Sequence, residues 1–537
     1  MEEFDTIVVG AGVSGLSAAR LLAVQGQKVV VLEARDRIGG RLHTERLDGR
    51  VTDLGASWIH GIDGGPLHAL TRAFGMPDAE FTIGSYQAGG RPIAYYGPDG
   101  VRLTDSAADH FIADAARVEV RLNAVIEAVP PGASYAEAAR TAVGQVAGTD
   151  GWDPERAARV VEYLDHRSEE QYGADSRLLD AHGLEDEVII GDEVVFPDGY
   201  DQLASNLAAG LDIRLEHVVT RVLRAGAAAG VDTGVVLETN RGTFTAARTV
   251  VTVPVGVLQS GRLTFDPPLP SSITGAVSKF RMNAFEKVFL RFPERFWDEG
   301  VYAVRRQGEA AKWWHSWYDL TDISGEPTLL TFAAGECAQE IRGWSDKRVI
   351  DSVLASLREI YGSRVPDPVH ARITDWQGDE WAGGSYAYMT RGCTAEDHTR
   401  LAEPVDGVLH LAGEATWEAD PATVNAALCS GHRAAEGFSV PGSRTKCCGS
   451  QSSAGPSLGT PRPDTAFRVG TDARCGIVGK LRWRNKCRSS SSRHILPLSG
   501  LFVSACWGIS PGSSRRACRR PPKPRRWTST RPAASPS

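Results

Sequence analysis

The strongest constraint on the fold is a glycine-rich stretch near the start of the chain. Phe4 to Val9 is an apolar, β-branched run typical of a buried strand, and Gly10, Gly12 and Gly15 follow it at GxGxxG spacing. Gly10 permits a tight turn, Gly12 lets a pyrophosphate approach the backbone, and Gly15 lets a helix over residues 14–25 lie close to the sheet. We therefore expect a βαβ unit whose helix N-terminus faces the phosphates of a dinucleotide.

The second strand of this unit ends in an acid. Residues 28–32 predict the strand, and Glu33 follows directly, 18 residues after Gly15. A carboxylate at this place accepts hydrogen bonds from a ribose 2′-hydroxyl and repels a phosphate. Because strand, turn, helix, strand and acid occur in order, dinucleotide binding is favoured over an ordinary glycine-rich turn.

The choice between NAD and FAD depends on the residues that follow. Gly39 and Gly40 bring the backbone close to the cofactor again, and Arg41 can neutralise diphosphate charge. Together with Arg37 they form RxGGR, which resembles the GG-doublet flavoproteins. That resemblance implies FAD, which the glycine spacing alone does not select. It also implies noncovalent FAD, since no cysteine stands in the family's attachment context before Thr423.

Length and charge bound the possible functions. The chain of 537 residues exceeds one ordinary domain, and 42% hydrophobic with 23% charged residues is typical of a soluble globular protein. The last 97 residues, 441–537, hold 19 of the 59 Lys and Arg residues and 2 of the 66 acids, so the first 440 carry −24 and this tail +17. The acidic body favours small cationic molecules and disfavours nucleic acid. The Ser-, Pro- and Arg-rich tail is expected to be disordered, whether it binds anionic surfaces or is a non-native extension.

Cysteine usage and the chain start suggest a compartment. The body holds only Cys337, Cys393 and Cys429, and no CxxC or paired histidine spacing suggests zinc, so we expect reduced thiols and no metal. The first strand begins at Phe4, which leaves no room for a signal peptide, and no apolar run approaches the length of a membrane span. We expect a cytoplasmic monomer or homodimer without membrane contact.

Residues 51–61, VTDLGASWIHG, place small residues ahead of a tryptophan and a histidine. This composition suits a segment that passes close to a flat cofactor, although an ordinary loop with a core tryptophan fits it equally well. The stretch GASWIHG resembles polyamine oxidases within the flavin amine oxidase family, in which a histidine stands in the substrate tunnel. The resemblance implies that His60 lines the approach, whereas a single histidine taken alone is more often structural.

Lys287 stands in the middle of NAFEKVFLRF, residues 283–292, in a strand that is predicted to be apolar on both faces. By itself, a lysine reaching from a sheet edge to water is the more common arrangement. Flavin amine oxidases carry a lysine in such a strand, ahead of FP and FW pairs that this chain has at 292–293 and 296–297. There the lysine holds a water against flavin N5. The resemblance therefore implies a catalytic lysine, and an apolar pocket is where a lowered pKa is expected.

Aromatic residues cluster again at 376–388, WQGDEWAGGSYAY. The cluster fits plain core packing, and it also resembles the WxxxxWxxGSYSY stretch of polyamine oxidases and flavin-type histone lysine demethylases. The resemblance implies that Trp376 and Trp381 lie against the cofactor and that Tyr386 faces the substrate amine. Stacked rings exclude water and steer an uncharged amine towards the flavin.

Residues 407–438 close the body. Asp420 and Pro421 are predicted as cap and first-turn proline of a helix over 422–437, preceded by a strand over 408–412. The helix N-terminus can stabilise negative charge on a reduced flavin. Thr423 replaces a tyrosine of the monoamine oxidases, which improves the match to polyamine oxidases and demethylases.

Three further stretches complete the body. Helical periodicity from residue 104 to 184 predicts an inserted helical segment, whose acids, including Glu169 and Glu170, are expected on solvated helix faces. Ile213 to Leu223 is predicted as one strand, in which the resemblance gives Val219 a backbone contact with adenine. Residues 249–258 are predicted as a strand that Pro254 closes.

The resemblance covers about the first 440 residues. It implies an α/β fold with a Rossmann-type FAD-binding domain (1–75, 190–262 and 405–440), an interleaved α+β substrate domain (76–189 and 263–404) and the tail. The residues that it implies for FAD binding are Gly10, Gly12, Val13, Ser14, Gly15, Glu33, Ala34, Arg35, Gly39, Gly40, Arg41, Gly55, Ala56, Ser57, Trp58, Val219, Trp376, Trp381, Gly413, Glu414, Thr423 and Val424.

The implied activity is that of an FAD-dependent amine oxidase, with a polyamine as the expected small-molecule substrate. A neutral amine would give a hydride from its α-carbon to flavin N5, water would cleave the imine to an aldehyde, and O2 would be reduced to H2O2. Lys287, Tyr386 and His60 are the expected catalytic residues. An L-amino-acid oxidase, another GG-doublet oxidoreductase such as a desaturase or porphyrinogen oxidase, and a flavin-bearing binding protein without turnover remain open.

Overall fold

The parallel part of the largest sheet contains the predicted βαβ unit. The computed structural model describes residues 2–63, 65–84, 88, 92–183, 190–226 and 231–438. Five parallel strands run in the order β9-β2-β1-β12-β21. Their bounds are Glu3–Val9 for β1, Val29–Leu32 for β2, Asp212–Arg214 for β9, Gly242–Val251 for β12 and Leu409–Leu411 for β21. This 3-2-1-4-5 order is that of a doubly wound dinucleotide-binding sheet, so the Rossmann prediction is confirmed.

A mixed extension, antiparallel except for its last pair β10–β13, continues this sheet from β12. It consists of β10 (Val219–Gly226), β11 (Val231–Thr239) and β13 (Thr264–Asp266). The predicted single strand over 213–223 is wrong, because the chain turns between β9 and β10, and Glu216 has a φ of 55°. β9 extends the parallel edge beside β2, whereas β10 pairs with β11. Alternating apolar residues on both sides of the turn produced the appearance of one strand.

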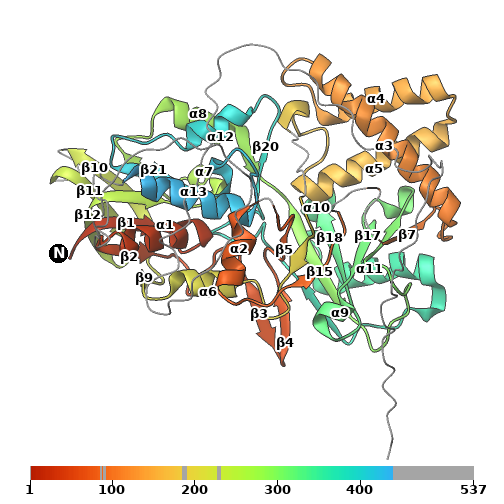
Figure 1. Ribbon diagram of the computed structural model, residues 1–537, viewed down its shortest axis with the longest axis horizontal. Helices are drawn as coiled ribbons and strands as arrows, with labels where there is room; N and C mark the ends of the chain where they lie inside the picture. Colours follow the sequence, from red (N-terminus) through yellow and green to blue (C-terminus); the bar gives the residue numbers. More distant parts are fainter. Residues whose placement is uncertain are drawn as a thin grey trace, which may run out of the picture. The chain divides into compact units, whose positions relative to one another are not determined.

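Helices α1 (Val13–Val24) and α13 (Val424–Gly437) lie side by side against the parallel strands (Figure 1). Their close approach depends on Gly431, since a Cβ there would overlap the backbone oxygen of Ser14. Two shorter helices, α2 (Pro66–Ala73) and α6 (Gln202–Ala208), contact α13 and α1 respectively. Both predicted long helices are present, within two residues of the predicted bounds.

A six-stranded sheet carries Lys287. Its order is β19-β15-β18-β17-β16-β7, antiparallel except for the last pair. The strands are β7 (Ile93–Tyr96), β15 (Phe285–Arg291), β16 (Ala303–Arg306), β17 (Ser316–Asp319), β18 (Thr328–Ala334) and β19 (His370–Ile373). Central strand β15 is buried on both faces, as its apolar alternation predicts. Helices α10 (Gly335–Ile341) and α11 (Asp346–Tyr361) share a core with this sheet, and α9 (Thr321–Ser324) follows β17.

The predicted helical insertion forms three packed helices, α3 (Asp105–Ala128), α4 (Tyr135–Asp150) and α5 (Pro154–Tyr172) (Figure 1). Side chains of Thr104 and Ser134 cap α3 and α4 by accepting hydrogen bonds from backbone amides of the first turn. Helix α5 ends at Gly173, whose φ of 59° is left-handed.

Short elements connect the two larger sheets. The strand predicted over 249–258 ends at Val251, and helix α7 (Val255–Gln259) begins after Pro254, so that part of the prediction is wrong. Proline has no backbone N–H and its φ suits the start of a helix. The other short elements are α8 (Ser271–Lys279), α12 (Ala395–Leu401) and the strands β3 (Thr44–Leu47), β4 (Arg50–Asp53), β5 (Trp58–Ile59), β6 (Ala79–Glu80), β8 (Val194–Val195), β14 (Phe280–Met282) and β20 (Ala387–Met389).

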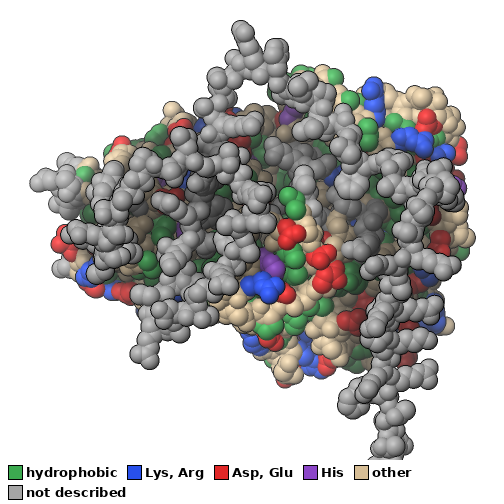
Figure 2. Space-filling model, in the orientation of Figure 1, with side chains coloured by type: hydrophobic (Ala, Val, Ile, Leu, Met, Phe, Trp, Pro, Cys, Tyr) green, Lys and Arg blue, Asp and Glu red, His purple; other side chains and the backbone are tan. Residues whose placement is uncertain are grey.

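The described residues belong to one compact unit. The predicted disorder of 441–537 lies outside the described residues, and the domain boundaries remain a prediction. No described helix is long and apolar enough to cross a membrane, and no described cluster of His, Cys, Asp and Glu is arranged to hold a metal ion. On the face shown in Figure 2, acidic and basic side chains are interspersed among apolar and neutral ones.

Candidate functional site

The turn between β1 and α1 forms an open cradle. Gly10 has a φ of 101°, which favours glycine, and its N–H donates to Leu32 O at 2.8 Å. Gly12 is the N-cap of α1 and provides no side-chain cap, and a Cβ on Gly12 would meet no atom within 4 Å. The first N–H groups of α1, at Val13 and Ser14, are thus not covered by a cap. A phosphate can be bound at such a helix start.

Glu33 lies beside this cradle at the end of β2. One carboxylate oxygen accepts from the N–H of Ala11 at 2.6 Å, and the other accepts from the N–H of Arg35 at 2.9 Å. The residue is buried. Since a carboxylate can accept about four hydrogen bonds, capacity for ribose hydroxyls remains. The backbone oxygen of Glu33 also accepts from His217 N–H at 2.8 Å, two residues before β10 begins at Val219. The contact of Val219 with adenine stays a prediction.

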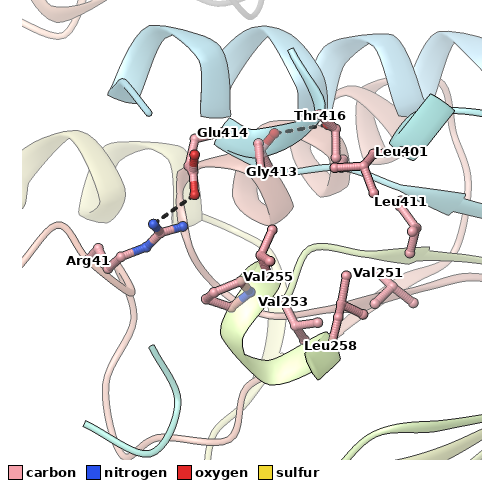
Figure 3. A pocket seen from close by; sticks show the side chains of 13 residues that line it. Arg41, Val251, Val253, Val255, Leu258, Leu401, Leu411, Gly413, Glu414 and Thr416 are labelled. Atoms are coloured by element: carbon pink, nitrogen blue, oxygen red, sulfur yellow. Dashed lines mark hydrogen bonds and ion pairs between the residues drawn. The ribbon is translucent and has the colours of Figure 1, made fainter. Parts of the chain in front are cut away.

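Arg41 and Glu414 form an ion pair at the edge of a pocket (Figure 3). Arg41 Nη1 donates to Glu414 Oε1 at 2.9 Å and to the backbone oxygen of Ser385 at 3.1 Å. Glu414 is buried, and its Oε2 receives no hydrogen bond from the described residues. A Cβ on Gly413 would meet only Thr252 O, at 4.0 Å. The pocket behind the pair has an apolar side formed by Val251, Val253, Val255, Leu258, Leu401 and Leu411.

The GG doublet joins these parts. Gly39 pairs with Gly12 in a parallel bridge, and its N–H donates to Ala11 O at 2.9 Å. The N–H of Ala56 donates to Arg41 O at 3.2 Å, which ties the segment 53–57 to the doublet. These contacts, with the Arg41–Glu414 pair, therefore link four distant stretches, 10–15, 33–41, 53–57 and 413–414, and the region that they border is called the groove below.

The start of α13 differs in detail from the prediction. Thr423, and not Asp420, is the N-cap, and its hydroxyl accepts from Ala426 N–H at 3.0 Å. Asp420 instead accepts from the Asn425 side chain at 2.6 Å, so the predicted cap and first-turn proline are wrong. Helix α13 therefore begins at Val424, two residues later than predicted. Threonine and aspartate both make good caps, and the sequence alone does not rank them.

Lys287 extends from β15 to the segment 53–57. Its Nζ donates to Asp53 O at 3.0 Å, Gly55 O at 2.6 Å and Ser57 Oγ at 2.5 Å. The ring of Trp58 lies 5.7 Å from Nζ. The side chain is buried, so a lysine that snorkels to water is not what the structure has. Ser57, expected to bind the cofactor, directs its hydroxyl to this lysine.

Burial shifts the pKa values of two groups here in opposite directions. Desolvation lowers the pKa of Lys287 to about 8, partly countered by the negative charge of Asp53. Desolvation raises the pKa of Asp53 to about 6, against hydrogen bonds from Thr44 and Tyr200 and the charge of Lys287. Near neutral pH, Lys287 is therefore far closer to losing its proton than an exposed lysine.

Two acids hold the loop that carries Trp376 and Trp381. Glu286 accepts from Thr374 Oγ1 at 2.6 Å and from the N–H groups of Trp376 and Gln377 at 2.9 and 3.0 Å. Trp376 Nε1 in turn donates to Leu54 O at 2.9 Å. Trp376 therefore lies at the groove. Its position is fixed by a buried carboxylate that sequence reasoning missed.

Asp379 is the second acid of this loop. It forms a bidentate ion pair with Arg35, at 2.6 and 2.7 Å, and accepts from Trp381 N–H at 2.9 Å. The guanidinium of Arg35, which was expected to contact the cofactor, thus binds Asp379 instead. Ala34, also expected at the cofactor, lies between Glu33 and Arg35 on the turn after β2. Trp381 lies 5.7 Å from the guanidinium of Arg262 and is half-buried.

Tyr386 lies between the groove and helix α5. Its hydroxyl donates to the backbone oxygen of Glu170 at 3.4 Å, and its ring lies 5.8 Å from that of Phe285. The expectation that Glu170 is on a solvated helix face is wrong, since its side chain is 6% exposed. Tyr318 Oη donates to this carboxylate at 2.5 Å, and His315 Nδ1 lies 3.3 Å from it. Burial raises the pKa of Glu170 to about 7.

Glu169, also expected on a solvated helix face, is half-buried in the structure. It packs beside Gly335 at the start of α10, and burial together with the charges of Asp175 and Asp165 raises its pKa to about 8. Both acids follow a charged, helical pattern that is typical of an exposed face. The signal that could have revealed them is the Gly173 C-cap, because the helix end before it turns into the core.

His60 stands at the end of β5 and hydrogen-bonds Glu193, a fully buried carboxylate. Glu193 also accepts from the N–H of Gly84 at 2.6 Å. The contacts of His60 thus lie on the side of the small sheet β5-β8-β6, and Trp58, two residues earlier, connects this position to Lys287. Sequence reasoning missed Glu193, which precedes a β-branched pair with no further sign of burial.

The groove fits a dinucleotide with an isoalloxazine ring. The uncapped start of α1 can bind the phosphates, and the acid at the end of β2 can bind the ribose. Gly12 and Gly413 leave room for a close approach of the backbone, and the buried Glu414 Oε2 can accept a further hydrogen bond. Lys287 and Trp376 both donate hydrogen bonds to backbone oxygens at the start of the segment 53–57.

Comparison with known proteins identifies flavin-dependent relatives of this chain. The family model described as flavin containing amine oxidoreductase matches residues 13–437. Polyamine oxidase 2 of Arabidopsis thaliana is 31% identical over 448 residues, which cover 80% of this chain and 87% of that protein. Lysine-specific histone demethylase 1 homolog 1 of Oryza sativa subsp. japonica is 31% identical over 460 residues, 80% of this chain and 52% of that protein. This chain thus spans about half the length of that demethylase.

A solved structure of wild-type putrescine oxidase bound to putrescine has the same fold. The TM-score is 0.65 at 22% sequence identity, over 81% of this chain and 98% of that chain. The likeness therefore extends over both larger sheets.

Proposed function

Because this chain belongs to the flavin containing amine oxidoreductase family and has FAD as its cofactor, we propose that it is a polyamine oxidase. A primary or secondary amine would be oxidised next to its nitrogen, and O2 would be reduced to H2O2. The observation that carries the proposal is Lys287, a buried lysine at the groove with its pKa lowered to about 8. Strongly perturbed pKa values cluster at functional sites, so a buried lysine of this kind is expected next to the cofactor.

Bound FAD supplies a two-electron acceptor, and the residues at the groove would hold it. The N–H groups at the start of α1 would bind the pyrophosphate, Glu33 the ribose, and Arg41 with Glu414 the remaining polar edge. FAD is expected to be bound noncovalently, because no cysteine stands in the family's attachment context before Thr423.

The chain's own residues would prepare the amine. Lys287, whose Nζ lies 2.6 Å from Gly55 O, would hold or release a proton at that nitrogen atom. Trp58 and Phe289, both within 6 Å of Nζ, would exclude other water. Tyr386, fixed by Glu170 and Phe285, would orient the amine. The amine must be neutral at the reacting nitrogen, so an apolar wall favours the productive form.

Two buried acids support a substrate with a second positive charge. Glu170 lies behind Tyr386 and Glu193 holds His60, and both carboxylates are out of contact with bulk water. In a site of low dielectric, the ionised form of each attracts a cation more strongly than a surface carboxylate would, and Glu170, whose pKa is raised to about 7, ionises in the neutral range. A diamine or polyamine has such a charge several ångströms from its reacting nitrogen, whereas an aromatic monoamine does not.

A peroxide assay across amines tests the proposal. The panel contains putrescine, spermidine, spermine, their acetyl forms, an aromatic monoamine, a dimethyl-lysine peptide and L-amino acids. Polyamines are expected to give the highest kcat/KM. Preference for the peptide would favour a demethylase, preference for amino acids would favour an L-amino-acid oxidase, and a yellow protein silent with every compound would favour a binding role.

A further inference from the structure

Lys287 has three acceptors, and only one of them is a side chain. Asp53 and Gly55 contribute backbone oxygens, whereas Ser57 contributes its hydroxyl at 2.5 Å, the shortest of the three distances. An ammonium group has three N–H donors, so the three contacts use all of them. A backbone oxygen is present whatever residue occupies its position, so Ser57 is where the chain can alter how Lys287 is held.

The hydroxyl of Ser57 accepts from Lys287 and does not donate to it. Its own proton is directed to Asp53 O and Gly55 O, each at 3.4 Å, which leaves a lone pair for Nζ. A hydrogen bond accepted from an ammonium favours the charged form of the lysine. Ser57 therefore acts against the burial that favours the neutral form.

Few other charges face Lys287. From β4, Asp53 is the one charged group that acts on its pKa, and the Asp53 carboxylate is itself bound to Thr44 Oγ1 and Tyr200 N–H. On its own strand, Glu286 is turned to the Trp376 loop. Opposite on β18 is Phe332, which is apolar. Beside burial and the charge of Asp53, the contacts that reach Nζ directly are therefore its three hydrogen bonds.

We propose that Ser57 is a positioning residue for Lys287, whose hydroxyl determines where Nζ lies and at which pH the lysine loses its proton. The inference deepens the proposed function, because it assigns to the segment 53–57 the control of the group next to FAD. It makes Ser57 a determinant of the pH range of the enzyme, in addition to a residue near the cofactor.

The direct test is an NMR titration of lysine Cε in the FAD-loaded full chain. The chain has nine lysines, and Lys287 is identified as the resonance lost in Lys287→Met. In Ser57→Ala the pKa of Lys287 is expected to fall by about one pH unit, since a hydrogen bond to a charged group contributes about that much. Ser57→Thr retains the hydroxyl and is expected to restore the wild-type value. Ser278→Ala, which removes an exposed hydroxyl bonded to Gly275 O, is the matched control and leaves Lys287 unchanged.

The pH profile of turnover is the second readout. The apparent pKa that Lys287 contributes to the pH profile of kcat is expected to be lower in Ser57→Ala than in the wild type. The decrease should equal the one measured in the NMR titration. A Ser57→Cys variant, with a weaker acceptor of similar size, is expected to lie between alanine and wild type, and it serves if the alanine variant does not fold.

Two failures are distinguishable. An unchanged Lys287 pKa in both Ser57→Ala and Ser57→Cys overturns the inference, even if the protein oxidises polyamines. A shifted pKa in a protein that oxidises no amine supports the role of Ser57 and contradicts the proposed function.

Discussion

The two larger sheets prepare the site by different means. In the eight-stranded sheet, the site is formed mainly by backbone N–H groups and glycines, as at Gly12 and at the start of α1. In the six-stranded sheet and the helices beside it, the site is formed mainly by the buried charged side chains of Lys287, Glu286 and Glu170. The first region is shaped to approach a cofactor closely, and the second is shaped to alter the protonation of groups near it.

This difference has an energetic meaning. A glycine cradle costs little in the folded protein without FAD, because it contains few unsatisfied groups apart from helix-end amides that water can reach. A buried lysine or glutamate carries a desolvation cost that hydrogen bonds offset only in part. Changes in the first region are therefore expected to alter cofactor affinity with little effect on stability, and changes in the second to alter both rate and pH dependence.

The largest effect is expected from Lys287→Met. Methionine has a similar length and no charge, so it removes the proton-bearing group from the second region without leaving a cavity. We expect the reaction of the reduced enzyme with oxygen to slow by about 10²-fold or more, with the melting temperature unchanged or higher. Stopped-flow spectroscopy of flavin reoxidation measures this, and an unchanged rate would remove Lys287 from the mechanism.

Glu169→Gln tests the pH dependence of the second region. The folded pKa of about 8 lies above the ordinary 4.5, so the folded state binds this proton more tightly. Stability from this group is therefore fully present below about pH 4.5 and is lost as pH rises to about 8. We expect the variant to gain about 1–2 kcal/mol over wild type at pH 8 and little at pH 4.5. Melting temperatures at both pH values measure it, with exposed Glu127→Gln as control; equal gains at both values would contradict it.

Gly12→Ala tests the first region. An added Cβ meets no protein atom within 4 Å, so the protein without FAD is expected to keep its melting temperature. The methyl group would occupy space that the pyrophosphate needs, and FAD affinity is expected to fall at least about tenfold, or about 1.4 kcal/mol. Fluorescence titration with FAD gives the affinity. Gly144→Ala on α4, where a Cβ also meets nothing, should leave it unchanged, and normal affinity in Gly12→Ala would place the pyrophosphate elsewhere.

The smallest effect is expected from removal of the basic tail. A chain that ends at Ser439 lacks the charge of +17 but keeps every residue of both regions. FAD content and kcat/KM are expected to stay within about twofold, since surface charge acts mainly on encounter. Loss of flavin or activity would show that residues 440–537 contribute to the site.

The sequence is informative about the first region because glycine spacing has a direct geometrical cause. Gly10 to Gly15 and Glu33 specify their own backbone, and the structure has the Rossmann sheet order that they predict. The sequence is less informative about the second region. Glu170 and Glu193 have ordinary polar neighbours along the chain, and their burial comes from segments more than 80 residues away, such as Tyr318 and His60. Lys287 was predicted through a family resemblance rather than from its own strand pattern.

The visible absorption spectrum of the purified full-length protein tests the central claim most directly, together with its change on anaerobic addition of spermine. The account predicts a yellow protein, reconstituted with FAD where needed, whose flavin bands bleach with spermine and return with air. A protein that stays colourless after incubation with FAD, or whose bands no amine bleaches, would contradict it.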